Sequence, residues 1–191
     1  MICTGPRACG IELARPLIKM GIIRYAVVPA TAMDGQTNPQ KVTNKKGCYT
    51  LVISLRKSQW LQIGKLGAAR FPRGTYSYTG SAMGGLGARI SRHLTKRNKK
   101  IHWHIDYLLR APETRVTKVL IYPATRKECL QNQRIAALPN AKVIMKGFGA
   151  SDCTSGCASH LIFLASKRPI GTKKLLDSSD IDAKEGILWK Q

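Results

Sequence analysis

The sequence predicts a mixed α/β (α+β) domain in which a small central β-sheet is flanked by helices, and three local patterns carry that prediction. Residues 48–55 are a run of apolar and β-branched side chains, which is typical of a buried strand. Residues 75–79 alternate threonine and serine with tyrosine, as in a hairpin strand. Further along, Leu86, Ile90 and Leu94 recur every four residues and indicate one face of a helix. A chain that passes from strands into a helix in this way combines both element types around one core.

The remaining elements follow from the same criteria. A second extended piece is expected at residues 60–63 and a turn at 71–74. Helices are expected at 103–109 and 126–138, and further strands at 116–122, 142–146 and 161–165. Residues 1–40 are punctuated by prolines and are assigned as an N-terminal extension. The domain is then expected to span residues 41–168, with a C-terminal tail at 169–191.

The charge of the chain indicates a polyanionic partner. It carries 32 Lys and Arg against 10 Asp and Glu, a net charge of +22. Residues 41–170 hold 24 of the basic and 4 of the acidic residues, which is +20 for that stretch. Closely spaced phosphates reward such a field through counterion release, so nucleic acid, and DNA in particular, is the expected partner. A surface that is merely well solvated would mix both signs.

The sequence favours an intracellular, cytoplasmic protein. No run of 18 apolar residues is present, so no membrane partner is expected. The apolar stretch at residues 21–33 contains Arg24 and Pro29, which makes it a poor signal-peptide core. Six widely spread cysteines indicate thiols or metal ligands rather than a disulfide scaffold.

Cysteine and histidine spacing near the C-terminus leaves a zinc site open. Cys153, Cys157 and His160 lie close together in sequence, and Cys129 or His104 could supply a fourth ligand. The gap between Cys153 and Cys157 is three residues rather than two, so ordinary buried thiols are the alternative.

The stretch from Tyr76 to Tyr107 is the candidate catalytic region. A strand, a glycine-rich turn and a helix would bring the Tyr78 phenol, the Arg89 guanidinium and the His93 imidazole together, because Arg89 and His93 are one helical turn apart. The turn lacks both the spaced glycines of a dinucleotide-binding unit and a Gly-Lys-Ser/Thr motif, so nucleotide binding is not expected.

Gly47-Cys48-Tyr49 and Tyr78-Thr79-Gly80 resemble the two motifs of the GIY-YIG nuclease superfamily. The similarity continues through Leu86, Arg89, His93 and His102. In detail the chain resembles a prokaryotic branch that is sometimes fused to endonuclease III-like repair proteins. The phrases that carry this likeness are Gly64-Lys65-Leu66-Gly67, His102-Trp103-His104-Ile105-Asp106-Tyr107 and Gly147-Phe148-Gly149-Ala150-Ser151-Asp152-Cys153.

The resemblance implies an antiparallel sheet and a metal-dependent phosphodiesterase of DNA, with Mg²⁺ or Mn²⁺ as cofactor and repair or processing as the setting. Tyr49 and Tyr78 would act as, or position, the general base, and Arg89 would neutralise the phosphoryl oxygens. Glu128 would hold the cation. His93 is expected to be functional as well. Asp152 stands where the superfamily has its closing residue and could be a further ligand.

Two departures from the superfamily accompany the resemblance. Tyr49 and Tyr78 are 29 positions apart in the sequence, so an extra strand near residues 60–64 must be inserted between their strands. The usual closing asparagine has no match.

Nucleic-acid contacts are expected from basic and imidazole side chains outside the catalytic group. These are Arg73, Arg92, Lys96, Arg97, Lys99, Lys100, His102 and His104. For His93, His102 and His104 a structural metal cluster is an alternative, and at least one of the three is expected to be buried and hydrogen-bonded. The rival to a nuclease is a non-catalytic nucleic-acid-binding module, which could serve as an adaptor for a repair-protein partner.

Overall fold

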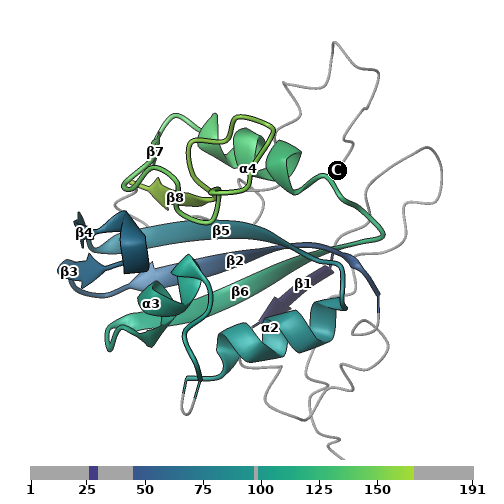
Figure 1. The fold of residues 1–191 in the computed structure, drawn as a ribbon, viewed down its shortest axis with the longest axis horizontal. Helices are drawn as coiled ribbons and strands as arrows, with labels where there is room; N and C mark the ends of the chain where they lie inside the picture. The colour runs from purple at the N-terminus through teal and green to yellow at the C-terminus, as the bar shows by residue number, and fades with distance from the viewer. Residues whose placement is uncertain (1–25, 30–44, 97–98, 166–191) are drawn as a thin grey trace, which may run out of the picture.

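The computed structural model describes residues 26–29, 45–96 and 99–165 of the chain. They form an α+β domain around a six-stranded antiparallel sheet (Figure 1). The strand order is β1-β6-β2-β5-β8-β7. The strands are β1 (Ala26–Pro29), β2 (Gly47–Leu55), β5 (Gly74–Ala82), β6 (Thr114–Pro123), β7 (Ala141–Lys142) and β8 (Leu161–Leu164). The predicted fold class is therefore confirmed.

Three α-helices pack on this sheet within the described residues: α2 (Leu86–Leu94), α3 (His104–Arg110) and α4 (Glu128–Ala136). Figure 1 shows α4 above the sheet and α2 below it. A separate two-stranded hairpin of β3 (Gln59–Gln62) and β4 (Ala68–Phe71) is joined by the 3₁₀ turn η2 (Gly64–Leu66). This hairpin lies between β2 and β5 in the chain, where an inserted extended piece was expected.

Alternation along β2 sorts its side chains onto two faces of the sheet. Tyr49, Leu51 and Ile53 belong to the larger core, which also contains Leu86 of α2 and Ile105 of α3. The larger core therefore lies between the sheet and the helices α2 and α3.

The opposite face of the sheet is covered by α4. Val52 packs there in a smaller cluster with Ile135 of α4 and with Ile162 and Leu164 of β8. The sheet is thus the middle layer of three, and side chains of β2 reach both outer layers.

Three assignments made from sequence need correction. The strand expected at residues 142–146 is wrong, because β7 stops at Lys142 and Val143 is 41% exposed. The chain then turns repeatedly until β8. Two strands were not expected from the sequence: β4, which pairs with β3, and the edge strand β1, which pairs with β6. β1 falls within the expected N-terminal extension; the rest of that extension and the expected tail at 169–191 lie outside the described residues. No helix in the described part of the chain is long and apolar enough to span a membrane.

Candidate active site and metal centre

A buried tyrosine–histidine pair lies at the centre of the site. The hydroxyl of Tyr49 on β2 lies 2.7 Å from Nε2 of His93 on α2, and both residues are at most 2% exposed. Gly80 faces Tyr49 across the β2–β5 ladder. A Cβ at that position would lie 2.7 Å from the tyrosine hydroxyl oxygen, so glycine leaves the space that the phenol needs. The sheet and α2 together therefore hold the pair in one geometry.

Asp106 anchors the helix side of this site. Its carboxylate is fully buried and accepts hydrogen bonds from Arg92 at 3.0 Å and from the backbone N–H groups of His102 and Trp103 at 2.9 and 3.1 Å. The ammonium of Lys99 lies 3.1 Å away. Burial by itself would raise the pKa of Asp106, but these donors outweigh it and lower the pKa to about 2. The carboxylate thus stays charged and ties α2 to α3.

His93 is a neutral imidazole between Tyr49 and Asp106. Burial lowers its pKa to about 3, although the Asp106 charge acts in the opposite direction. Nδ1 of His93 lies 3.9 Å from Oδ1 of Asp106. The tautomer that suits both neighbours carries its proton on Nδ1, so that Nε2 accepts the hydrogen bond from the Tyr49 hydroxyl. Burial, reinforced by Tyr78, raises the pKa of Tyr49 well above its usual value, so this phenol is un-ionised at neutral pH.

This arrangement predicts an acid-sensitive fold. Unfolded histidine titrates near pH 6.5 and folded His93 near 3, so between these values the unfolded chain binds more protons. The free energy of unfolding should therefore fall as the pH drops from about 6.5, by on the order of 2 kcal/mol at pH 4.5. Asp106 contributes only below its usual value of 3.8. Urea unfolding at pH 7.0 and 4.5 measures the change.

His93→Gln is the matched control for that measurement. A glutamine oxygen can still accept the Tyr49 hydroxyl but does not titrate, while the charged neighbours Asp106, Lys99, Arg89 and Arg92 are unchanged. The variant should lose less stability than wild type between the two pH values. An identical loss in both proteins would contradict the assignment of a neutral, buried His93.

Tyr78 and Arg89 complete the group that the sequence predicted to come together. The Tyr78 ring, on β5, lies 6.2 Å from the His93 ring and 6.3 Å from the Phe148 ring. Burial raises the pKa of Tyr78, Glu128 adds to the rise, and Arg89 opposes it. The half-buried Arg89 guanidinium lies 4.0 Å from the centre of the Trp103 ring. Phenol, guanidinium and imidazole therefore share one region of the molecule.

A glycine of the loop between β7 and β8 makes room for Tyr78. Gly149 has a φ of +65°, and a Cβ there would lie 2.8 Å from the Tyr78 ring. Its backbone N–H donates to Nδ1 of His104 at 3.1 Å, which links this loop to α3. The loop thus helps to define the surroundings of the Tyr78 phenol.

The negative charges of two carboxylates, Glu128 and Asp152, affect the ionisation of Tyr78. Glu128 begins α4 and is half-buried, and Asp152 is exposed. The pKa of Tyr78 is raised mainly by burial and further by both charges. Neither carboxylate belongs to a cluster of three or more metal-ligating side chains among the described residues.

One cluster in the described residues could hold a metal ion. Cys129, Cys153, Cys157 and His160 each offer one ligand atom, and these atoms all lie within 4.8 Å of one another. Sγ of Cys129 lies 3.6 Å from Sγ of Cys153 and 3.8 Å from Nε2 of His160. Cys129 lies on α4, and the other three residues lie in the loop between β7 and β8. We call these four residues the Cys₃His cluster.

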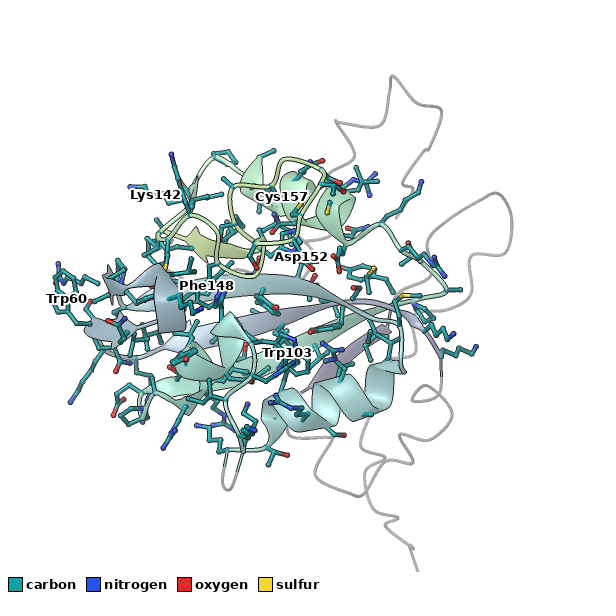
Figure 2. The ribbon with its side chains drawn as sticks, in the orientation of Figure 1. Trp60, Trp103, Lys142, Phe148, Asp152 and Cys157 are labelled. Carbon is teal, nitrogen blue, oxygen red and sulfur yellow. The ribbon has the colours of Figure 1, made fainter. Side chains whose placement is uncertain are left out.

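The Cys₃His cluster confirms the predicted meeting of Cys153, Cys157 and His160 and decides their fourth neighbour. That neighbour is Cys129, whereas Nδ1 of His104 accepts the Gly149 N–H instead. The cluster lies on the α4 side of the sheet, where Figure 2 labels Cys157.

The residues expected to contact nucleic acid divide into two groups. Arg73, Lys100 and His102 are exposed; Lys96 is also exposed, and its ammonium donates to the Thr114 carbonyl at 2.8 Å. By contrast, Arg92 and Lys99 form ion pairs with the buried carboxylate of Asp106, and His104 accepts a hydrogen bond from the Gly149 N–H. Arg97 lies outside the described residues.

Sequence reasoning assigned no role to Asp106, although it organises the site. The available signal was an acidic residue at the third position of a short helix whose preceding segment is strongly basic. Such a residue can cap the helix, and Asp106 indeed accepts the N–H of Trp103, the residue before α3. Gly80 and Gly149 were quoted only as parts of motifs, yet each leaves room for a site tyrosine.

Residues 48–178 match the family model described as "Domain of unknown function DUF123". The chain belongs to the DUF123 family. The expected membership of the GIY-YIG superfamily is therefore wrong, because the family that matches is a distinct one. The DUF123 match runs from β2 past β8 and includes both the Tyr49–His93 pair and the Cys₃His cluster. No curated protein and no solved structure matches the chain.

Proposed function

We propose that this DUF123 protein is a nuclease that hydrolyses phosphodiester bonds of nucleic acid, most specifically DNA. The observation that supports this most directly is the convergence of Tyr78, Arg89 and the hydrogen-bonded Tyr49–His93 pair in a protein of net charge +22. Cleaving a phosphodiester requires a positioned water, neutralisation of the phosphoryl oxygens and support for the leaving oxygen. The site holds side chains suited to the first two tasks.

In this proposal the two tyrosines have different roles. Both tyrosines are buried, Tyr78 with 7% and Tyr49 with 1% of its surface exposed. We assign the less buried Tyr78 to contact the substrate and Tyr49 to act through His93 as a positioning residue. Because the pKa of both phenols is raised, neither is a phenolate at neutral pH. Tyr78 therefore orients the attacking water through hydrogen bonds rather than by removing its proton as an anion.

Arg89 supplies positive charge for the reaction. Its guanidinium is oriented by the Trp103 ring at 4.0 Å, which limits its freedom before substrate binds. A pre-positioned guanidinium can donate two parallel hydrogen bonds to phosphoryl oxygens, and it stabilises the transition state at little reorganisation cost.

A divalent cation would complete the site. Oxygen ligands suit Mg²⁺ or Mn²⁺, and Glu128, with Asp152 as a second carboxylate, would hold the ion, because both charges act on Tyr78. When bound, the ion would neutralise charge on the phosphate.

For the Cys₃His cluster we propose zinc in a structural role. Tetrahedral Zn²⁺ with sulfur and nitrogen ligands separates its sulfur atoms by about 3.8 Å and sulfur from nitrogen by about 3.6 Å. The Cys129–Cys153 and Cys129–His160 separations of 3.6 and 3.8 Å are close to those values. Four protein ligands leave no open position, which is typical of a structural site. Cysteines that stay reduced also suit the cytoplasm, where we place the protein.

The proposed activity is tested by incubating the full-length protein with end-labelled single-stranded, duplex and branched DNA and with RNA, with and without Mg²⁺. We expect Mg²⁺-dependent cleavage of at least one DNA substrate. Omitting Mg²⁺ should stop cleavage, and adding Mg²⁺ back to the same sample should restore it. If none of the nucleic acids is cleaved under any of these conditions, the nuclease proposal fails.

A non-catalytic nucleic-acid-binding module is the second candidate. The burial of Tyr49 and His93 favours it, since neither residue can touch a substrate in this structure. In that reading the pair only packs the core, and the charge of the protein alone explains binding.

Both candidates predict DNA binding that depends strongly on salt. If the protein contacts 6–10 phosphates, raising the salt from about 50 to 200 mM should weaken affinity by roughly 10³-fold or more. Fluorescence anisotropy with a labelled duplex measures this. Arg73→Ala and Lys100→Ala each remove an exposed cation. Each should reduce the slope of log affinity against log salt concentration by about one. Salt-independent affinity would rule out a phosphate-dominated interface.

A further inference from the structure

We propose that the outer face of the β3–β4 hairpin is a stacking platform for an unpaired base. Through this platform the protein would bind single-stranded nucleic acid. This inference rests on the proposed function, because it assumes that the partner is nucleic acid. It adds that the protein recognises a single strand. Its single most direct observation is Trp60, whose side chain is 70% exposed.

The hairpin has one buried face and one open face. Leu61, Ala69 and Phe71 turn inward and pack against the larger core. Because side chains alternate along a strand, Trp60 and Arg70 turn outward, and they lie directly opposite each other in the β3–β4 ladder. The inner face therefore anchors the hairpin, and the outer face stays available.

The second outward pair of the hairpin adds little bulk beside Trp60. The second outward pair is Gln62 opposite Ala68. The Gln62 side chain folds back to donate to the Gly64 carbonyl at 3.0 Å, and Ala68 has only a methyl group. Next to the Trp60 indole there is thus no long side chain standing up from Ala68 or Gln62.

No cation covers the Trp60 ring among the described residues. The two guanidinium contacts with an indole both involve Trp103, at 4.0 Å for Arg89 and 4.3 Å for Arg92. Trp60 and Val143 are the large apolar side chains exposed in the described part of the chain. Figure 2 shows Trp60 projecting at the outer end of the molecule.

The charge of the hairpin selects nucleic acid over an apolar protein partner. Residues 56–73 contain five basic residues and no acidic one: Arg56, Lys57, Lys65, Arg70 and Arg73. Arg56 pairs with Glu113 at 3.1 Å, and the other four are exposed. An aromatic ring among cations is the pattern that binds single strands, because bases stack on the ring and phosphates contact the cations. A protein-docking surface would instead need a contiguous apolar patch.

The test compares Trp60→Ala, Trp60→Phe and wild type for affinity toward a single-stranded oligonucleotide and a blunt duplex of the same length. Trp60→Ala should weaken single-strand binding by roughly 5- to 100-fold and leave duplex binding within about twofold. Trp60→Phe should retain most of the wild-type affinity for the single strand, because a phenyl ring still stacks on a base. Val143→Ala, which truncates the other exposed apolar side chain, should change neither affinity.

Two outcomes would overturn the platform: unchanged single-strand affinity in Trp60→Ala, or an equal loss for single strand and duplex. Failure of the proposed nuclease is recognised separately, because cleavage is scored in the Mg²⁺ assay and not by binding. A protein that never cleaves but loses single-strand affinity in Trp60→Ala keeps the platform. A protein that cleaves normally and is indifferent to Trp60 keeps only the nuclease.

Discussion

Cys153→Ser is expected to release bound zinc and to lower the melting temperature of the protein by about 5–15 °C. Cys153 is one of four residues whose ligand atoms lie within 4.8 Å of one another. Replacing one thiolate by a hydroxyl removes one of the four ligands of the proposed zinc site, so the ion should be held too weakly to be retained. Elemental analysis of freshly purified protein and differential scanning calorimetry measure the two effects.

The size of that effect follows from the loop that the cluster holds. Between β7 and β8 the chain runs for 18 residues, 143–160, without a helix or strand. A few turn hydrogen bonds support it, such as that from the Gly147 N–H to the Ala158 carbonyl at 2.8 Å. A metal that ties Cys153 and His160 to Cys129 on α4 restricts this long loop, and its binding free energy becomes folding free energy.

Cys48→Ser is the matched control for the zinc experiment. Cys48 is a buried thiol of β2 outside the Cys₃His cluster, and its Sγ donates to the Thr125 carbonyl at 3.2 Å, a bond that serine can also make. This variant should retain its zinc. Absence of zinc from unchelated wild-type protein, together with an unchanged melting temperature in Cys153→Ser, would reduce the cluster to packed thiols.

Tyr78→Phe, Arg89→Ala and Glu128→Ala are each expected to lower the rate of Mg²⁺-dependent cleavage by about 10²–10³-fold, provided the protein is the nuclease proposed above. Tyr78→Phe keeps the ring and its contacts with His93 and Phe148 but removes the hydroxyl that orients water. Arg89→Ala removes the guanidinium donor. Glu128→Ala should also raise the Mg²⁺ concentration needed for half-maximal residual activity, because it removes an ion ligand.

DNA affinity should be nearly unchanged in these three variants. The charge of +22 is spread over many other side chains, so one substitution removes a small part of the field. Single-turnover cleavage with saturating protein separates rate from binding, and thermal melts confirm folding. Arg115→Ala, which removes an exposed cation of β6, is the control and should cleave like wild type. Wild-type rates in all three site variants would refute the roles assigned to these residues. A wild-type protein that cleaves no nucleic acid would leave the binding-module reading.

The sequence alone determined the elements whose signal is local. The apolar run of β2, the alternation in β5 and the four-residue repeat of α2 each predicted the right element. A continuous apolar run suits a strand that is buried on both faces, and a regular repeat places like side chains on one face of a strand or helix. The short spacing of Cys153, Cys157 and His160 also predicted that they meet, because a few residues of loop can bring such ligands together. The expected family was wrong, because a set of short matching phrases does not define membership as a match over residues 48–178 does.

Only the tertiary structure decided which distant groups touch. Tyr49 and His93 are 44 positions apart, and Cys129 and Cys153 are 24 apart, so no local pattern states that they meet. The choice of Cys129 over His104, and the neutral state of His93, depend on burial and on neighbours brought in by other elements. Likewise β7 is short because the following residues form the loop that delivers Gly149 to Tyr78 and Cys153 to Cys129. Such contacts follow from the packing of the whole sheet and its helices, which side-chain periodicity does not encode.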